Sequence, residues 1–495
     1  MSDALILAID QGTSSTKTII FDQKGEAVFK ATEPLQTHYL DGNRVEQDPE
    51  DIYQNVITSV RKCLDGFSSN GGDPGEIATC GISNQRETFV LWDDLGKPLY
   101  NAVVWQCKRS VGVCQRLKDD GIEAKVSERT GLIIDPYFSG TKVMWLYENE
   151  PEIKSAIDQG KAYFGNIDTW LLYKMTGGKA YSTDYTNASR TLFFNLKDLS
   201  WDHELLADFG LSKLNLPELK PSAYAFGTTN LNGLLKQEIT ISGMIGDSHA
   251  AAFGEGCFDP GNAKATLGTG SSILMNIGST PKKSTNGMMT TICWSTKDRV
   301  DYALEGIIVS AGSTVEWVKN QLGLFTEIEE LEAACLAVKD NGGVYIIPAF
   351  SGLGAPHWDM NRKASIEGIS FDTTKNHIMR AAVESIPYQI KDVIAAMESD
   401  AGVPLTELKI DGGITSNKLV VQFLADLLER KITNIKIADV SALGAAYLAG
   451  ITAGIFKDID QLKMLNQHTK STQSGPDTAK VKGYYEGWKK VINHR

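Results

Sequence analysis

The chain has 495 residues, of which 42% are hydrophobic and 22% charged, so its composition is that of an ordinary globular protein. This excludes a disordered, collagen-like or coiled-coil chain, and the length allows about three domains, or alternatively two large or four small ones. The net charge of −12 argues against a nucleic-acid binder, which usually carries a basic face. It leaves open the binding of a small anion by backbone N–H groups.

Seven cysteines are spread along the chain, and no two of them form a CxxC pair. This excludes a disulfide framework and a zinc site, and it favours a reducing compartment. The first residues lack the basic start of a signal peptide, and no apolar run approaches the roughly 20 residues of a membrane span. We therefore expect a soluble, cytoplasmic protein without membrane insertion.

The start of the chain predicts an antiparallel meander of three strands. The runs 4–10, 17–22 and 27–34 are rich in apolar residues, and short turns of small or polar residues separate them. The first run ends in a carboxylate, Asp10, followed directly by the turn Gln-Gly-Thr-Ser-Ser.

A helix is expected to start at Pro49, because Asp48 provides an N-cap and two acidic residues follow in the first turn. Residues 75–85 predict a buried strand that runs into a polar loop, and residues 89–100 predict a hairpin. Helical segments and loops alternate over residues 110–240.

Residues 238–256 predict a strand, a Gly-Asp turn and a helix of small residues. We place a domain boundary in this segment, giving an N-terminal domain of residues 1–252 and a C-terminal domain of residues 253–495. Residues 263–278 then repeat the pattern of strand, small-residue turn and strand found at the start of the chain. Two copies of one fold would place two phosphate-binding hairpins opposite each other.

The second half continues with helices. Residues 376–399 predict a helix that Pro387 should kink or interrupt. Residues 407–417 predict a strand that meets a glycine turn, and residues 418–430 an amphipathic helix. Residues 441–456 predict a helix whose small residues allow close backbone packing, and the last 25 residues predict a surface helix.

Asp10 and the turn after it are a candidate site for a polyphosphate with its Mg²⁺. A carboxylate binds the metal or its water, while backbone N–H groups, hydroxyls and Lys17 meet phosphate oxygens. The alternative is that these residues form a hairpin turn that binds no ligand. The chain contains no Walker A motif.

Two glycine turns are further candidates. Residues 268–272, Gly-Thr-Gly-Ser-Ser, allow a phosphate to approach the backbone. Asp411-Gly412-Gly413 follows a strand, where ligands of open α/β sheets usually lie. Ordinary tight turns are the alternative in both cases.

Asp247 follows Gly246 between a predicted strand and helix, so it is either a general base for a substrate hydroxyl or a helix N-cap. Arg86 and Glu87 follow the buried strand, and such a pair can hold two hydroxyls of a polyol or form a surface ion pair. Trp105 and Tyr137 offer apolar walls for a pocket, although aromatic residues are more often part of a core.

These motifs, in this order, resemble the FGGY carbohydrate kinases and, among them, the glycerol kinases. The similarity runs from about residue 4 to about residue 455. It includes the stretches DQGTSSTKTIIFD, NQRET, NAVVWQCKRS, DPYFSGTKVMWLYEN, GTGSS, ALEG, PAFSGLGAPHWD, GISFDTTKNHIMRAAVE, IDGGITSN and ALGAAYLAG.

The resemblance implies an α/β fold with two actin-like (ribonuclease H-like) ATPase domains flanking a central cleft. It implies transfer of the ATP γ-phosphoryl group to a terminal hydroxyl of a small polyol, glycerol before any other, with Asp247 as general base. By position, Asp10 would bind Mg²⁺. The polyol site would be formed by Arg86, Glu87, Trp105, Tyr137, Asp247, Ser248 and Ser272. The nucleotide would be bound by Thr13, Ser14, Ser15, Lys17, Thr269, Gly312, Glu316, Gly413 and Asn417.

The chain departs from the glycerol-kinase pattern at two positions of this implied pocket. Ser248 and His249 stand where Gln-Gln is usual, and Ser272 stands where a phenylalanine is usual. Both changes enlarge the pocket and make it more polar, which favours a longer polyol or ketose as the alternative substrate. An actin-like ATPase and a silent sugar sensor are the rival functions.

Residues 226–242 show neither of the regulatory elements of some bacterial relatives, a loop for an anionic sugar bisphosphate or a phosphorylatable histidine. We therefore expect no control by either route. Relatives are often homodimers or homotetramers, and this chain carries no interface signature of its own.

Overall fold

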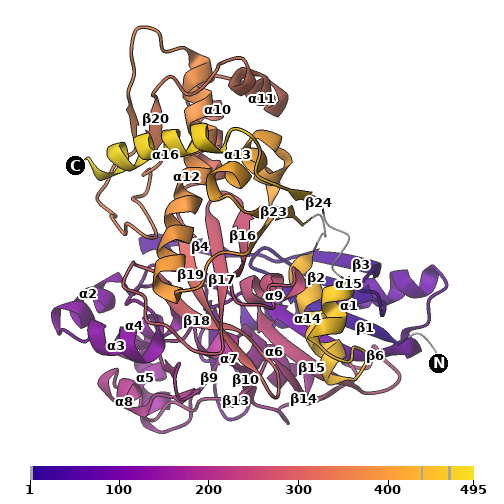
Figure 1. Cartoon of the computed structure of the whole chain (residues 1–495). Coiled ribbons are helices and arrows are strands. Elements are labelled where there is room, and N and C mark those ends of the chain that lie inside the picture. The colour runs from indigo at the N-terminus through magenta and orange to yellow at the C-terminus, as the bar shows by residue number, and fades with distance from the viewer. Residues whose placement is uncertain (1–3, 436–438, 466–469, 495) are drawn as a thin grey trace.

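The computed structural model describes residues 4–435, 439–465 and 470–494 (Figure 1). One sheet belongs to the first half of the chain, and we call it the N-terminal sheet. It has six strands in the order β14-β15-β6-β1-β2-β3. The strands are β1 (Leu5–Gln11), β2 (Ser15–Phe21), β3 (Ala27–Pro34), β6 (Ile77–Asn84), β14 (Ala223–Thr229) and β15 (Ile239–Gly246).

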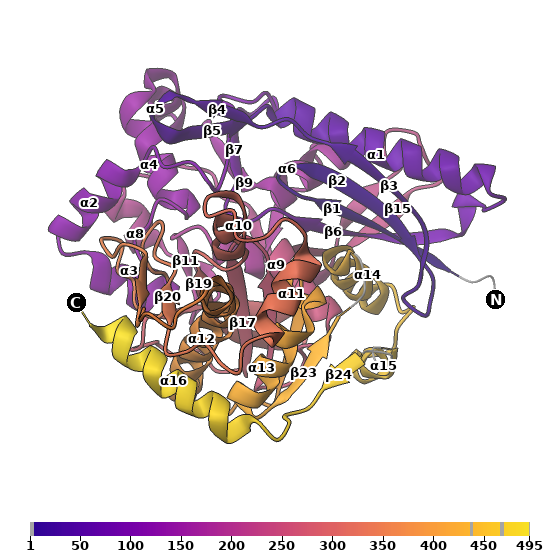
Figure 2. The same ribbon diagram turned by 90° about the horizontal axis from the view of Figure 1, so that it is seen from above.

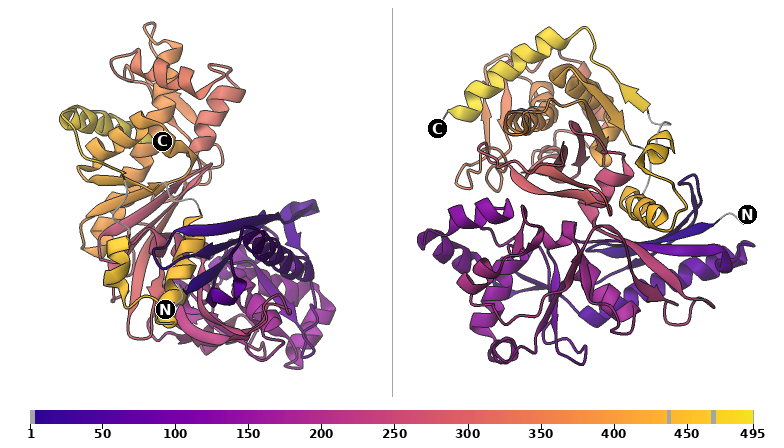
Figure 3. Two further views of the ribbon diagram at one scale, coloured as in Figure 1. Left: turned by 90° about the vertical axis from the view of Figure 1, so that its right-hand side faces the viewer. Right: turned by 60° about the horizontal axis from the view of Figure 1, so that its bottom comes forward.

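A second sheet, the C-terminal sheet, has seven strands in the order β18-β19-β17-β16-β22-β23-β24. Figure 3 shows the two halves of the chain as two bodies that are stacked on each other. The strands are β16 (Asn262–Leu267), β17 (Ser271–Gly278), β18 (Met289–Ser295), β19 (Val300–Ile308), β22 (Glu407–Asp411), β23 (Lys431–Asn434) and β24 (Lys470–Thr472).

The two sheets repeat one topology. In the first, β1 pairs antiparallel with β2 and β2 with β3, whereas β6 and β15 follow in parallel. In the second, β16 pairs antiparallel with β17 and β17 with β19, whereas β22 and β23 follow in parallel. The predicted repeat of one fold, with a hairpin opening each copy, is therefore confirmed.

This topology decides where functional side chains gather, because parallel strands end at a common edge of their sheet. In the N-terminal sheet, β1, β6 and β15 run in parallel and end next to Asp10, Arg86 and Asp247. In the C-terminal sheet, β16 and β22 end next to Thr269 and Gly413.

Two helices lie between the sheets, α9 (Asp247–Gly254) and α14 (Val440–Thr452) (Figures 1 and 2). Glycine makes their close contact possible, since a Cβ on Gly444 of α14 would lie 1.9 Å from the carbonyl oxygen of Ala250 on α9. A Cβ on Gly81 of β6 would lie 2.3 Å from the carbonyl oxygen of Ala445. The expected close packing of the small-residue helix is confirmed. The expected division between residues 252 and 253 falls within α9.

The remaining part of the N-terminal half adds a sheet of five strands and a set of helices beside the N-terminal sheet. The strands are β4 (His38–Leu40), β5 (Arg44–Gln47), β7 (Phe89–Trp92), β8 (Ala102–Val103) and β9 (Tyr163–Asn166). The helices are α1 (Pro49–Ser69), α2 (Val111–Asp119), α3 (Glu123–Thr130), α4 (Ser139–Asn149), α5 (Pro151–Asp158), α6 (Ile167–Met175), α7 (Tyr185–Ala188) and α8 (His203–Asp208).

Helices cover the C-terminal sheet, and the short pair β20 (Tyr345–Ile347) and β21 (Ser365–Glu367) lies beside them. The predicted helix around Pro387 is a single helix, so of the two expected effects, a kink or an interruption, the interruption does not occur. Pro387 is buried among apolar neighbours, and their packing offsets the backbone hydrogen bond that proline lacks. Of these helices, α12 (Lys375–Ala401) and α13 (Lys418–Leu428) pack directly on the sheet. The other helices of this half are α10 (Gly312–Asn320), α11 (Ile328–Leu336), α15 (Ile459–Leu465) and α16 (Thr478–Asn493).

Two further findings concern the cysteines and membrane-spanning helices. All seven cysteines are free and buried, so none takes part in a disulfide. Among the helices of the described residues, none is long and apolar enough to cross a membrane.

Candidate active site

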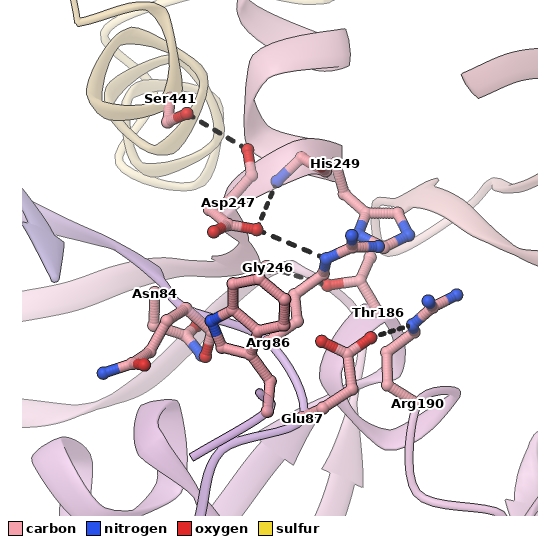
Figure 4. Close-up of polar contacts among 12 residues, drawn as sticks. Asn84, Arg86, Glu87, Thr186, Arg190, Gly246, Asp247, His249 and Ser441 are labelled. Atoms are coloured by element: carbon pink, nitrogen blue, oxygen red, sulfur yellow. Dashed lines mark hydrogen bonds and ion pairs between the residues drawn. The ribbon is translucent and has the colours of Figure 1, made fainter. Parts of the chain in front are cut away.

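Asp247 is the first residue of α9, directly after the last residue of β15. The N-cap position belongs to Gly246, so the alternative of an aspartate N-cap is wrong here. The carboxylate Oδ1 accepts a hydrogen bond from the backbone N–H of Ser248 at 2.6 Å and lies 3.3 Å from Arg86 Nε (Figure 4). The side chain is 40% exposed, so solvent or a substrate can reach a carboxylate that the protein already orients.

Arg86 is the buried centre of this site. Its Nη1 donates to Glu305 Oε1 at 2.9 Å, and its Nη2 lies 3.5 Å from the hydroxyl of Tyr137. Burial alone would raise the pKa of Glu305, yet Arg190 and Arg86 hold it below its usual value. Arg86 therefore joins the two halves of the chain beside Asp247.

Glu87 is buried and points to a different arginine. Its Oε1 accepts a hydrogen bond from Arg190 Nε at 2.6 Å, so it forms no direct pair with Arg86 (Figure 4). The surface ion pair, the other possibility for these two residues, is excluded by their burial. Burial also raises the pKa of Glu87. Glu305 lies in the stretch ALEG of the resemblance, but neither Glu305 nor Arg190 was predicted as a site residue.

Tyr137 and Trp105 form an aromatic wall next to Arg86. Their rings meet edge to face with centroids 5.6 Å apart, and Trp105 Nε1 donates to the hydroxyl of Thr13 at 2.9 Å. Below them, the buried Lys142 donates to the carbonyl oxygens of Pro136 and Tyr137. Burial lowers the pKa of this lysine to about 7. Lys142 thus supports the loop that carries Tyr137, a role that the sequence did not indicate.

The residues at the two unusual positions also lie near this site. Ser248 Oγ lies 3.5 Å from Nζ of the buried Lys264. Ser272 pairs with Thr266 across β16 and β17, and its buried hydroxyl has no hydrogen-bond partner among the described residues. His249 is fully buried, and its Nδ1 likewise has no partner in the described part of the chain. Two buried polar atoms, Ser272 Oγ and His249 Nδ1, therefore lack a hydrogen bond from the described residues.

Asp10 lies at the end of β1, where it pairs with Lys17 of β2. Burial raises the pKa of Asp10 to about 6, and the nearby charge of Asp247 adds to this effect. The described residues contain no group of three or more histidine, cysteine or acidic side chains able to hold a metal by themselves. Asp10 still suits Mg²⁺, which usually takes only one or two carboxylates besides water and substrate phosphates.

The first hairpin presents fewer free groups than the sequence indicates. A hydrogen bond of 3.0 Å from Gly12 N to Ser15 O closes its turn, and Ser14 at the tip is exposed. The hydroxyl of Thr13 already binds Trp105, and Lys17 Nζ lies 2.7 Å from Asp439 Oδ1. A phosphate at this hairpin would therefore meet mainly backbone N–H groups, with Lys17 shared between it and Asp439.

The predicted nucleotide residues of the C-terminal half line one pocket of about 350 Å³. The second hairpin forms its rim, since Gly312 N donates to Gly268 O at 2.9 Å and Ala311 N donates to Thr269 O at 2.8 Å. Asn417 caps the start of α13 on the opposite side. The predicted residues in the pocket are Thr269, Gly312, Glu316, Gly413 and Asn417.

An apolar wall completes this pocket, and sequence reasoning missed it. Its residues come mainly from α10 to α13, where they are part of ordinary helical apolar patterns and carry no motif. A flat aromatic base packs well against such a wall, as ligand pockets commonly combine apolar sides with a few polar groups. The wall residues are Val315, Ile328, Leu331, Val383, Ile386, Ile414 and Val420.

Comparison with known proteins agrees with this geometry. Residues 5–254 match the N-terminal domain of the FGGY family of carbohydrate kinases, and residues 263–453 match its C-terminal domain. A glycerol kinase from Carboxydothermus hydrogenoformans is 44% identical over 99% of this chain and 98% of its own length. A glycerol kinase from Halothermothrix orenii is 42% identical over 100% of this chain and 98% of its own length.

Solved structures agree as well. A Plasmodium falciparum glycerol kinase, crystallised with ADP, superposes with a TM-score of 0.92 at 36% identity, covering 99% of this chain and 98% of that one. A ligand-bound xylulose kinase from Lactobacillus acidophilus has a TM-score of 0.89 at 21% identity, covering 99% of this chain and 98% of that one. At this identity the likeness shows the fold alone.

Proposed function

Because the chain belongs to the FGGY family of carbohydrate kinases, we propose that it transfers the γ-phosphoryl group of ATP to a terminal hydroxyl of glycerol. The similar proteins named above as glycerol kinases support the choice of polyol. One observation carries the proposal for the chemistry: the half-exposed carboxylate of Asp247, held by the buried Arg86 at 3.3 Å.

In this proposal Asp247 accepts the proton of the attacking hydroxyl. A general base must lie within hydrogen-bond reach of that proton, and Asp247 is accessible and oriented by Arg86 and the Ser248 N–H. Arg86 and Tyr137 bind the polyol hydroxyls. Glu87 acts indirectly, through its hydrogen bond with Arg190. Trp105 covers the carbon chain.

ATP would lie with its base in the pocket of the C-terminal half and its phosphates between the two hairpins. Asp10 would hold Mg²⁺, which supplies charge neutralisation for the phosphates when it is bound. The chain carries a net charge of −12, so backbone N–H groups and hydroxyls, rather than a basic surface, have to offset the remaining phosphate charge. We place this activity in the cytoplasm, where seven buried free thiols stay reduced.

A longer polyol is the second candidate substrate, because the buried hydroxyl of Ser272 has no partner among the described residues. A hydroxyl of a four- or five-carbon substrate would satisfy it. We keep glycerol first because Arg86, Glu87, Trp105 and Tyr137 lie together beside Asp247.

The test is a coupled assay of ADP release with ATP, MgCl2 and a panel of glycerol, erythritol, ribitol, xylitol and xylulose. We expect turnover only when a polyol is present, with the highest kcat/KM for glycerol. ATP turnover independent of any polyol would instead favour an actin-like ATPase. Binding of a polyol without turnover would favour a sugar sensor.

A further inference from the structure

Glu305 lies on β19 of the C-terminal sheet, between two arginines of the N-terminal half. Its Oε1 accepts a hydrogen bond from Arg86 Nη1 at 2.9 Å, and its Oε2 lies 2.6 Å from Arg190 Nη1. The side chains of Glu305 and Arg190 are fully buried, and that of Arg86 is 5% exposed. The three residues therefore form an ion-pair cluster, shielded from water, across the boundary of the two halves.

The position of Glu305 does not depend on these arginines alone. The neighbouring strand β18 is bonded to the N-terminal half, with Thr290 N donating to Gly131 O at 2.9 Å. Ser222 N donates to Ser295 Oγ of the same strand at 2.8 Å. Because β19 pairs with β18 along most of its length, the backbone holds Glu305 at a fixed place beside Arg86.

The other nitrogens of Arg86 face the proposed substrate site. Nε lies 3.3 Å from Asp247 Oδ1, and Nη2 lies 3.5 Å from the Tyr137 hydroxyl. A guanidinium is planar and rigid, so fixing one of its nitrogens restricts the directions that the other two can take. The bond from Glu305 to Nη1 thus helps to determine where Nε and Nη2 point.

We propose that Glu305 is a positioning residue for substrate binding, which holds the Arg86 guanidinium so that Nε and Nη2 meet the substrate hydroxyls beside Asp247. This inference rests on the proposed function, since it needs a hydroxylic substrate next to Arg86. Glu305 touches no reacting atom and acts only through Arg86. Without its charge, the ion pair that holds Nη1 is lost, and only Asp247 and the Tyr137 hydroxyl still hold the direction of the guanidinium.

The variant Glu305→Gln tests this proposal because it keeps the size of the side chain and removes its charge. The matched control is Asp301→Asn on the same strand. Asp301 is fully buried and lies 2.7 Å from Arg299 Nη2, and in the described part of the chain its side chain contacts none of the proposed site residues. Both variants lose a buried carboxylate paired with an arginine, so a general loss of stability affects both.

For Glu305→Gln we expect the KM for glycerol to rise at least tenfold, while the KM for ATP changes less than twofold. For Asp301→Asn both KM values should stay within twofold of the wild type. In an Arg86→Gln background, Glu305→Gln should add less than a further twofold, because residues that act as one unit are not additive. Additive effects, or a glycerol KM that moves no more than in the control, would overturn the proposal.

If Glu305→Gln does not fold, Glu305→Asp gives the answer, because it keeps the charge and shortens the side chain by one methylene. We expect a rise of about threefold in the glycerol KM for this variant, and an unchanged KM would overturn the proposal. The wild type is measured first in the same assay. A wild type without polyol turnover contradicts the proposed function, whereas an active wild type with an insensitive Glu305 contradicts this inference alone.

Discussion

Arg86 Nε and Asp247 Oδ1 lie 3.3 Å apart, although the two residues follow different strands and are separated by 160 positions of the chain. Their strands, β6 and β15, are parallel neighbours that end at the same edge of the N-terminal sheet. A buried arginine thus holds a partly exposed carboxylate, the group that we propose as the base for the substrate hydroxyl.

The variant Asp247→Asn should remove the proposed base and keep the shape of the site. We expect kcat with glycerol to fall by roughly 10²- to 10⁴-fold, the usual contribution of general base catalysis. The KM for ATP should change less than twofold. The measurement is steady-state ADP release at saturating ATP.

Asp202→Asn is the matched control for this variant. Asp202 also lies at the start of a helix, as the N-cap of α8, and is held by an arginine, with Arg129 Nη1 3.0 Å from its Oδ2. We expect full activity and a modest fall in Tm. An Asp247→Asn variant with wild-type kcat would remove Asp247 as the base.

The proposed nucleotide pocket predicts different outcomes for two of its glycines. A Cβ on Gly413 meets no protein atom within 4 Å, whereas a Cβ on Gly312 would lie 2.7 Å from the carbonyl oxygen of Gly268. Gly413→Ala should therefore keep its Tm and raise the KM for ATP at least tenfold, because only a ligand meets the new methyl group. Gly312→Ala should lower the Tm as well.

Thermal melts and ATP titrations of both variants measure these effects. Gly483→Ala on α16 is the control, since its Cβ would also meet no atom within 4 Å. We expect it to leave the KM for ATP unchanged and to raise the Tm slightly, because alanine is a better helix former than glycine. If Gly413→Ala bound ATP as the wild type does, the nucleotide would have to lie elsewhere.

Much of this site could be predicted from the chain because its groups follow directly after apolar strands. Asp10, Arg86 and Asp247 each lie at such a strand end, where the fold gathers ligand-binding groups. Glu305 and Arg190 were missed for a physical reason. Their importance comes from a pairing between distant segments, and their local sequences carry no signal of it.

Pro387 shows a case in which a clear local signal in the sequence does not decide the structure. Proline in a helix interior costs about 3 kcal/mol, so the local rule predicts a kink or a break. In α12 the flanking residues Ile386 and Ile390 are buried in the core, and the helix continues from Lys375 to Ala401. Tertiary packing outweighs the local preference of proline at this position. A single sequence does not show which of these two effects is the larger.

Asp10 should link Mg²⁺ to stability. Its pKa is raised from 3.8 to about 6 by burial, so the folded state binds the proton more tightly than the unfolded state between these values. Ionisation of Asp10 therefore lowers the stability of the folded state. This loss grows from about pH 4 to pH 6 and stays constant above pH 6. Asp10→Asn should melt at a higher temperature than the wild type at pH 7.5 without ligands.

MgCl2 added together with ADP should reverse this order, because the cation stabilises only a protein that keeps the carboxylate. Differential scanning fluorimetry with and without both ligands measures the effect, and activity of Asp10→Asn should fall at least 100-fold. Equal stabilisation of wild type and variant by MgCl2 and ADP would mean that Asp10 does not hold the metal.

Glu255, directly after α9, should give the protein a second pH dependence. Both its carboxylate oxygens are buried and have no hydrogen-bond partner among the described residues. Burial, with a smaller effect of the Asp411 charge, raises its pKa from 4.5 to about 8. The folded state therefore binds an extra proton between pH 4.5 and 8, and the stability contribution of Glu255 falls as the pH rises through this window.

Glu255→Gln should remove this dependence, since the amide does not ionise. We expect its Tm advantage over the wild type to widen from pH 5 to pH 8 and to stay constant above pH 8. The exposed Glu26→Gln is the control and should follow the wild type at every pH. A constant difference between pH 5 and pH 8 would contradict the raised pKa.

Ser272 should set the size of the substrate. It lies on the face of β17 that also carries Leu274, whose partner across the ladder is Glu305. The variant Ser272→Phe would fill the space beside the unpartnered hydroxyl with a bulky apolar ring. We expect turnover of erythritol, ribitol and xylitol to fall at least tenfold, while kcat/KM for glycerol stays within threefold of the wild type.

Ser272→Ala separates size from hydrogen bonding in the same panel, because it leaves the space and removes only the hydroxyl. If this hydroxyl binds the oxygen on the fourth carbon of erythritol, the variant loses one hydrogen bond to that substrate. The KM for erythritol should then rise roughly five- to tenfold, while the KM for glycerol stays unchanged. Equal effects of Ser272→Phe on glycerol and on the longer polyols would show that the ring blocks the whole pocket, and Ser272 would then play no part in selecting chain length.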